Sequence, residues 1–126
     1  SYNMLGLERS TIRSPQAIPP GRATVRFDFQ YDGGGLGKGG TGTLSVNGRK
    51  VAEGRIEHTQ PMIFSADETA DVGVDLGTPV VEAVGVESQS RFNGKIPKVT
   101  VEVRDVSPQA EAAVKRALAE VIHKTE

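Results

Sequence analysis

Residues 32–43 read DGGGLGKGGTGT, and seven of the ten residues from Gly33 to Gly42 are glycine. Glycine brings no side chain to pack, and it loses much backbone freedom when it becomes ordered. Neighbouring segments must therefore hold this stretch in place if it is ordered. A regularly alternating segment precedes it and an Asn-Gly pair follows it, which predicts that the stretch connects two parts of one β-structure.

Residues 22–31, just before the glycines, alternate between apolar and polar side chains. One face would carry Ala23, Val25, Phe27, Phe29 and Tyr31, and the other Arg22, Thr24, Arg26, Asp28 and Gln30. This period of two predicts a half-buried antiparallel strand. Beyond the glycines, residues 43–46 and 49–56 flank Asn47-Gly48, which favours a type I′ hairpin. A two-residue loop would place Leu44 opposite Val51, with both side chains in the core.

The other segments predict further strands and one helix. Residues 2–13 read as extended, 14–21 as a turn, 58–65 as a short apolar run after Pro61, and 77–90 as a long loop. Residues 70–76 and 92–104 alternate, the latter with Val99, Val101 and Val103 inward. Ser107 and Pro108 suit a helix start, and Val114, Leu118, Val121 and Ile122 form an apolar stripe over residues 109–124.

These elements predict a mainly β fold. We expect an antiparallel β-sandwich of jelly-roll type, complete or lacking some strands, over residues 1–104. Residues 105–126 would form one C-terminal α-helix that packs on the sandwich or on a partner chain. A chain of 126 residues leaves room for one core and little more.

Composition excludes several functions. The 15 basic and 16 acidic residues nearly cancel, so the sequence predicts neither a nucleic-acid partner nor a membrane partner. The absence of cysteine excludes disulfides, thiol catalysis and zinc–thiolate sites in this chain. It leaves the compartment open between cytoplasm and periplasm. Because the chain opens on Ser1 and runs straight into strand-like sequence, we expect a processed piece of a longer protein.

The glycine-rich stretch has two interpretations. Gly35–Gly40 matches GxGxxG formally, but a dinucleotide site needs a helix after that motif, and here a strand is expected. A Walker loop is also excluded, because Gly37-Lys38 is followed by glycine. The simpler interpretation is a flexible connection between strands. The alternative is a loop near an anion such as sulfate, formed by Gly35, Gly37, Lys38, Gly39 and Gly40.

A second candidate site is acidic. Asp67, Asp71 and Asp75 could seat calcium together with backbone carbonyls, although solvated carboxylates are the simpler explanation of the cluster. The two histidines, His58 and His123, lack metal-ligand spacing, and His58 reads as a loop residue. No GxSxG nucleophile motif occurs. The sequence therefore predicts no catalytic residue and no cofactor within this chain.

Several blocks of sequence nevertheless resemble one family. They are YNMLGLERSTIRS (residues 2–14), the run from PPGRATV to DLGTPV (residues 19–80) and FNGKIPKVTVEV (residues 92–103). In this order they look like the C-terminal region of large bacterial arylsulfatases, over roughly residues 2–104. In that family the region is similar to a concanavalin- or laminin-G-like β-sandwich that follows the sulfatase domain.

The resemblance implies a non-catalytic role for this piece. The sulfatase domain of such a parent carries a formylglycine nucleophile, made within a C/S-x-P-x-R motif, and a calcium ion. Ser14-Pro15 does not fit that motif, so no catalytic residue carries over to this chain. The implied function is an accessory domain that buttresses the sulfatase domain of the same polypeptide and lines its entrance with the glycine-rich loop.

Two other functions stay open. The chain could be a carbohydrate-binding module, although it has no Trp and only Tyr2 and Tyr31 as tyrosines. It could also be a structural or dimerising unit, with the apolar stripe of the C-terminal helix on a neighbour. The family's sandwich begins before the segment that matches Tyr2, so we expect bare strand edges and self-association of the isolated chain as a homo-oligomer.

Overall fold

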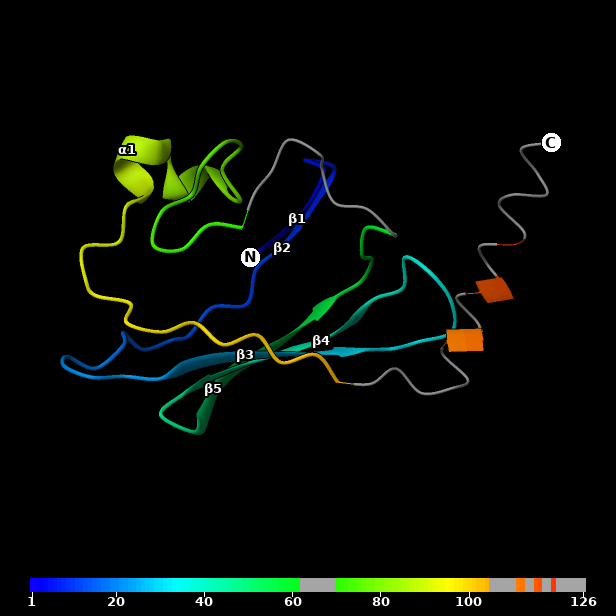
Figure 1. The fold of residues 1–126 in the computed structure, drawn as a ribbon, viewed down its shortest axis with the longest axis horizontal. Helices are drawn as coiled ribbons and strands as arrows, with labels where there is room; N and C mark the ends of the chain where they lie inside the picture. Colours follow the sequence, from blue (N-terminus) through cyan, green and yellow to red (C-terminus); the bar gives the residue numbers. More distant parts are fainter. Residues whose placement is uncertain (62–69, 105–110, 113–114, 117–118, 120–126) are drawn as a thin grey trace.

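The computed structural model describes residues 1–61 and 70–104, together with 111, 112, 115, 116 and 119. The elements are β1 (Tyr2–Met4), β2 (Glu8–Ser10), β3 (Val25–Tyr31), β4 (Gly40–Val46), β5 (Arg49–Ile56), a 3₁₀ turn η1 (Glu82–Val84) and α1 (Glu87–Ser90). They form two antiparallel sheets, β1-β2 and β3-β4-β5 (Figure 1). The predicted mainly β fold is confirmed, and a complete sandwich or jelly roll is not shown.

The three-stranded sheet separates apolar from polar side chains as the alternation predicts. Phe27 pairs with Leu44, and Asp28 pairs with Thr43, so each pair shares one face. We call one side the apolar face. It carries Val25, Phe27, Phe29 and Tyr31 of β3, Gly40, Gly42, Leu44 and Val46 of β4, and Ala52, Gly54 and Ile56 of β5.

The β4–β5 hairpin turns at the predicted pair. Asn47 has a φ of 51° and Gly48 a φ of 79°, which is the left-handed pair that a type I′ turn requires. The predicted pairing of Leu44 with Val51 is wrong, because Leu44 lies opposite Ala52. A β-bulge between Leu44 and Ser45 gives β5 one extra residue, and the register shifts by one at that point.

The glycine-rich stretch contributes to the sheet itself. Strand β4 begins at Gly40, three residues earlier than predicted, and Gly40 and Gly42 are buried. A Cβ on Gly42 would lie only 2.8 Å from Cε2 of Phe27. Glycine is therefore needed at this position because the aromatic ring of the neighbouring strand covers it.

The N-terminal segment folds back on itself. The prediction of one extended segment over residues 2–13 is wrong, since β1 and β2 pair around a turn at Leu5-Gly6. Leu5 has a φ of 51°, Gly6 a φ of 74°, and the Leu7 amide donates to the Met4 carbonyl at 2.9 Å. These values define a tight turn. In the sequence, a leucine at the first turn position hid this turn.

Two predicted strands are absent from the second part of the described chain. Residues 70–76 and 92–104 have no strand, and Val99, Val101 and Val103 are 58%, 83% and 88% exposed rather than inward. Alternation alone does not make a strand, because an extended segment needs a backbone partner. The expected loop at 77–90 contains η1 and the four-residue α1.

Only part of the predicted C-terminal helix is described. Glu111, Ala112, Lys115, Arg116 and Ala119 are helical, and Lys115 pairs with Glu111 at 2.8 Å. The apolar stripe of that helix and the run Met62-Ile63-Phe64 lie outside the described residues. Within the described part, no helix is long and apolar enough to cross a membrane.

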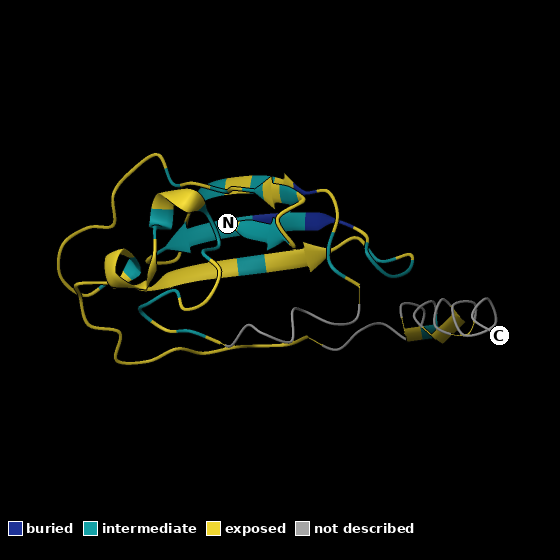
Figure 2. Ribbon diagram, turned by 90° about the horizontal axis from the view of Figure 1, so that it is seen from above, coloured by how far each residue is buried: buried dark blue, intermediate teal, exposed yellow. Residues whose placement is uncertain are grey.

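Burial is slight throughout the described chain. Ile56 is the one large apolar side chain there that is buried, at 5% exposure. Strand β3 is exposed along nearly its whole length, whereas β4 lies covered between its neighbours (Figure 2). The sheet thus presents an uncovered apolar face rather than a closed core.

Candidate functional site

The glycine-rich loop, residues 32–39, is tied down at its base by an ion pair. Arg55 of β5 donates to both carboxylate oxygens of Asp32, at 2.9 and 2.6 Å, and to Thr41 Oγ1 at 3.1 Å. The hydrogen bonds from Arg55 lower the pKa of Asp32 below its ordinary value. Because this bidentate pair joins the end of β3 to β5, it fixes where the loop leaves the sheet.

Tyr31 closes the same loop from within. Its hydroxyl group donates to the Gly35 carbonyl and accepts the Lys38 amide at 3.0 Å. Thr59 holds the other side, with its hydroxyl donating to the Lys38 carbonyl at 2.7 Å. The loop therefore has a defined shape, and its closing contacts come from the last residue of β3 and from the chain that follows β5, at one end of the sheet.

Positive φ angles explain why this loop is built from glycine. Gly33, Gly34, Gly35 and Gly37 have φ values of 76°, 77°, 124° and 68°. Residues other than glycine, asparagine and aspartate rarely adopt positive φ values. The sequence predicted a glycine connection here, and the pattern gave no sign that Tyr31 and Thr59 would close it.

The residues predicted for an anion site fall into two groups. Gly35, Gly37 and Lys38 lie in the loop, and Lys38 is exposed. Gly39 and Gly40 are buried in the sheet, and a Cβ on Gly39 would lie 2.5 Å from the Glu57 carbonyl oxygen. Among the described residues no ion pair involves Lys38, so its ammonium group is available at the loop's surface.

The apolar face lies next to this loop and carries exposed aromatic rings. Phe27 is 54% exposed, and Phe29 and Tyr31 are each 40% exposed. The rings of Phe29 and Tyr31 lie 6.4 Å apart, centre to centre. Ile12 covers Gly42 and Gly54 from the chain before β3. Exposed apolar patches of this kind mark binding surfaces.

The opposite face of the sheet carries ion pairs. Arg26 donates to Asp28 at 2.8 Å, and Lys50 donates to Glu53 at 2.8 Å. These donors lower the pKa of Asp28 and the pKa of Glu53. All four side chains are exposed to solvent, so each pair adds little to stability. This face is a solvated surface, in contrast to the apolar one.

The residues predicted for calcium hold local turns where they are described. The Asp71 carboxylate accepts the Leu76 amide at 2.8 Å, and the Asp75 carboxylate accepts the Val80 amide at 2.9 Å. Asp67 lies outside the described residues. No cluster of three or more metal-ligating side chains occurs in the described part of the chain. The calcium site stays a prediction.

His58 pairs with a carboxylate. Its Nδ1 lies 3.0 Å from Oε2 of Glu8 in β2, and the nearby Gln60 amide donates to the Tyr2 hydroxyl at 2.6 Å. Both contacts join the small N-terminal sheet to the chain that follows β5. His58 thus serves as a loop residue between two parts of the fold, as predicted, and His123 lies outside the described residues.

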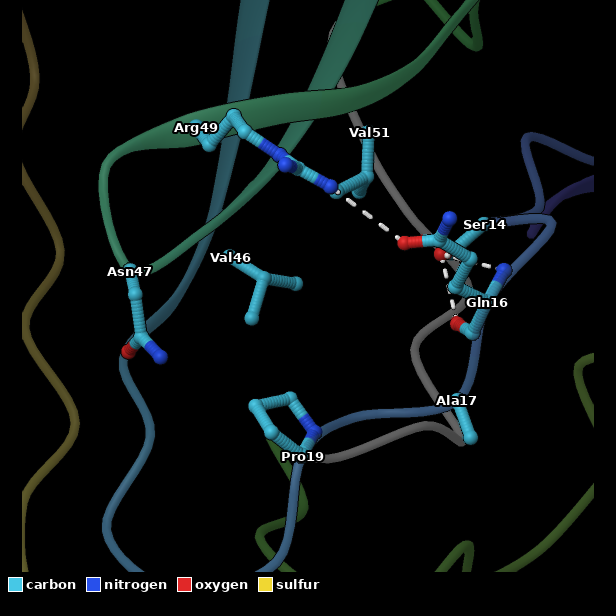
Figure 3. Close-up of a pocket in the computed structure, with 8 residues that line it drawn as sticks. All are labelled: Ser14, Gln16, Ala17, Pro19, Val46, Asn47, Arg49 and Val51. Carbon is cyan, nitrogen blue, oxygen red and sulfur yellow. Dashed lines mark hydrogen bonds between the residues drawn. The ribbon is translucent and has the colours of Figure 1, made fainter.

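A groove of about 420 Å³ lies at the far end of the sheet, beside the Asn47-Gly48 turn (Figure 3). It is lined by Ser14, Gln16, Ala17, Pro19, Val46, Asn47, Arg49 and Val51. Arg49 reaches across it and donates to Oε1 of Gln16 at 3.3 Å. Its guanidinium is thus already engaged by a neutral amide, and the groove presents no second charged group.

Comparisons with family models, curated proteins and solved structures give no match to this chain. Functional inference therefore rests on its residues and their geometry.

Proposed function

We propose that this chain is a non-catalytic accessory domain of an arylsulfatase, a sulfuric ester hydrolase. The support comes from the three sequence blocks in family order, at residues 2–14, 19–80 and 92–103. In this proposal the formylglycine nucleophile and the calcium ion belong to the sulfatase domain of the same polypeptide. The present chain would stabilise that domain and would contribute no catalytic residue.

The uncovered apolar face carries this proposal. Phe27 and Phe29 are 54% and 40% exposed, and Ile12 reaches over Gly42 and Gly54 from outside the sheet. Aromatic rings contribute large apolar areas when they become covered. A larger domain seated on this face would bury them and would hold the sheet against the catalytic domain.

The glycine-rich loop supports the second part of the proposal, that the chain lines the entrance of the parent's active site. The loop has a fixed shape, and Lys38 stands exposed on it. An ammonium group on a glycine scaffold attracts anions such as a sulfate ester. We assign Lys38 the role of guiding the anionic substrate, together with Gly35 and Gly37.

The first test uses the parent polypeptide that contains this chain. A C/S-x-P-x-R motif in the reading frame upstream of Ser1 is expected, and the absence of a sulfatase domain there would reject the proposal. In that polypeptide, Phe27→Ser with Phe29→Ser should lower the melting temperature, by about 2 °C or more for each kcal/mol of stability lost. Leu7→Ser with Ile18→Ser, two exposed apolar residues off the sheet, is the matched control and should change it little.

The loop is tested separately through turnover of 4-nitrophenyl sulfate. Lys38→Gln should raise KM about threefold to tenfold and leave kcat unchanged, because an exposed guiding charge acts on binding. Lys95→Gln, an exposed lysine outside the loop, is the control. Equal KM values for both variants would reject the role of the loop in guiding the substrate. They would not affect the proposal that the chain buttresses the catalytic domain.

Carbohydrate binding is a second candidate that one observation favours. The exposed rings of Phe29 and Tyr31 stand on the apolar face of the sheet, where sugar rings could stack. A glycan array probed with the chain distinguishes this candidate. Hits that disappear with Tyr31→Ala would establish it, and an array without hits would remove it.

A further inference from the structure

Strand β3 has one edge that no other strand covers within the described chain. The sheet order places β4 on one side of β3 and no described strand on the other. The Asn47 amide donates to the Thr24 carbonyl at 2.8 Å, and the Asp32 amide to the Gly39 carbonyl at 3.0 Å. Even-numbered residues of this stretch therefore turn their backbone groups toward β4, and Val25 and Phe27 turn theirs to the free edge.

A valine-rich segment runs along that free edge. Residues 98–104, here called the valine segment, lie beside β3 on the side away from β4 and run in the same direction (Figure 2). Arg26 contacts Glu102 at 3.5 Å, and Asp28 contacts Arg104 at 3.8 Å. The residue numbers of the two partners thus rise together, from 26 to 28 in β3 and from 102 to 104 in the valine segment. This is the register of a parallel pair.

No backbone hydrogen bond joins the valine segment to β3, although both lie in the described chain. Val101 and Val103 are 83% and 88% exposed. The segment is therefore aligned by its charges without being paired through its backbone. Its sequence alternates valine with polar residues, as a strand at the edge of this sheet would require.

We propose that the valine segment is the occupant of the free β3 edge and adds to the sheet as a parallel fourth strand. In the register set by the two ion pairs, the amides of Glu102 and Arg104 donate to the carbonyls of Val25 and Phe27. Val101 and Val103 then lie on the same side as Phe27. The apolar face becomes four strands wide and offers a broader surface to a second sheet.

This inference goes beyond the proposed function, because it concerns one edge and one segment of the chain itself. It holds or fails whether the parent is a sulfatase or not. The addition covers the exposed backbone of β3, which otherwise invites pairing with other chains. It also removes apolar surface of the valine segment from contact with water.

Amide hydrogen exchange of the unaltered chain, followed by NMR, tests the inference directly. The amides of Glu102 and Arg104 should exchange about tenfold more slowly than those of Val101 and Val103, which point away from β3. The two valine amides serve as internal controls in the same segment. Equal, rapid exchange at all four positions would overturn the proposal, and so would protection of the valine amides instead.

A charge interchange tests the register independently of that measurement. Glu102→Arg with Arg104→Glu places like charges opposite Arg26 and Asp28, so the protection should be lost. Adding Arg26→Asp and Asp28→Arg restores opposite charges and should restore the protection. Circular dichroism checks that each variant keeps its sheet. A folded double variant with unchanged protection would contradict the proposed register.

Discussion

Residues 25–56 and residues 70–104 both contain segments that alternate apolar with polar side chains, yet only the first region forms strands. In the first region, Asn47-Gly48 and the glycine-rich loop bring each extended segment back beside its neighbour. In the second region, no such turn presents a partner. Asp71 and Asp75 instead accept backbone amides five residues ahead and bend the chain.

The difference shows that alternation selects which face a side chain takes, while the turns decide whether a sheet forms. Val25 lies in a strand because β4 returns along it. Val101 has the same kind of neighbours in sequence and lies exposed at an unpaired edge.

Gly42→Val should break the paired region. The new side chain would meet Ile12 and the ring of Phe27, and both must move. Overpacking of this kind costs about 1–3 kcal/mol and occasionally more, and we expect the upper end because a strand backbone lies beneath. Urea unfolding measures the loss. Ser45→Val, on the polar face of the same strand, is the control and should be near neutral.

Phe27→Ser with Phe29→Ser should alter association of the isolated chain. We predict that the free chain self-associates, because the apolar face and the outer edge of β5 are uncovered among the described residues. Sedimentation over a range of concentrations should show oligomers that weaken markedly in this variant. Leu7→Ser with Ile18→Ser again provides the control. A wild-type chain that stays monomeric at high concentration would contradict the prediction.

Tyr31→Phe should loosen the glycine-rich loop without harming the sheet. The change removes the hydroxyl that contacts Gly35 and Lys38, at a cost of about 0.5–1.5 kcal/mol for each bond. Hydrogen exchange at residues 33–38 should become faster, while exchange in β4 and β5 stays the same. Retained protection in the loop would mean that Thr59 and the Asp32–Arg55 pair hold it unaided.

Strands that lie next to clear turn signals could be predicted from the sequence. The alternation of residues 22–31 gave β3, and Asn47-Gly48 gave the β4–β5 turn. The bulge at Leu44 could not be predicted, because the register shift depends on how the two strands twist together and no residue type announces it. The turn at Leu5-Gly6 was hidden because leucine seldom takes a positive φ.

At the glycine-rich loop, too, local sequence predicted one part of the structure and the folded sheet determined the rest. The glycines at residues 33–37 predicted a connection between strands, and that much follows from local sequence. The residues that close it, Tyr31, Arg55 and Thr59, come from separate segments and meet only after the sheet forms. Gly39 and Gly40 looked like loop residues, and the sheet places them under neighbouring backbone and side chains.

The smallest expected effect is on the pH dependence of stability. Hydrogen bonds from Arg55 lower the pKa of Asp32 in the folded chain below the unfolded value of about 3.9. A lowered folded pKa means that this pair stabilises the fold above the unfolded value, and that the contribution disappears as pH falls through the folded one. The thermal midpoint of Asp32→Asn should therefore lie closest to that of the unaltered chain at the most acid pH, and the gap should widen toward neutral pH. Because the pair is exposed, 1 M salt should reduce the difference between the two thermal midpoints. A difference that changes with neither salt nor pH would show that Asp32 acts through the shape of the loop rather than through its charge.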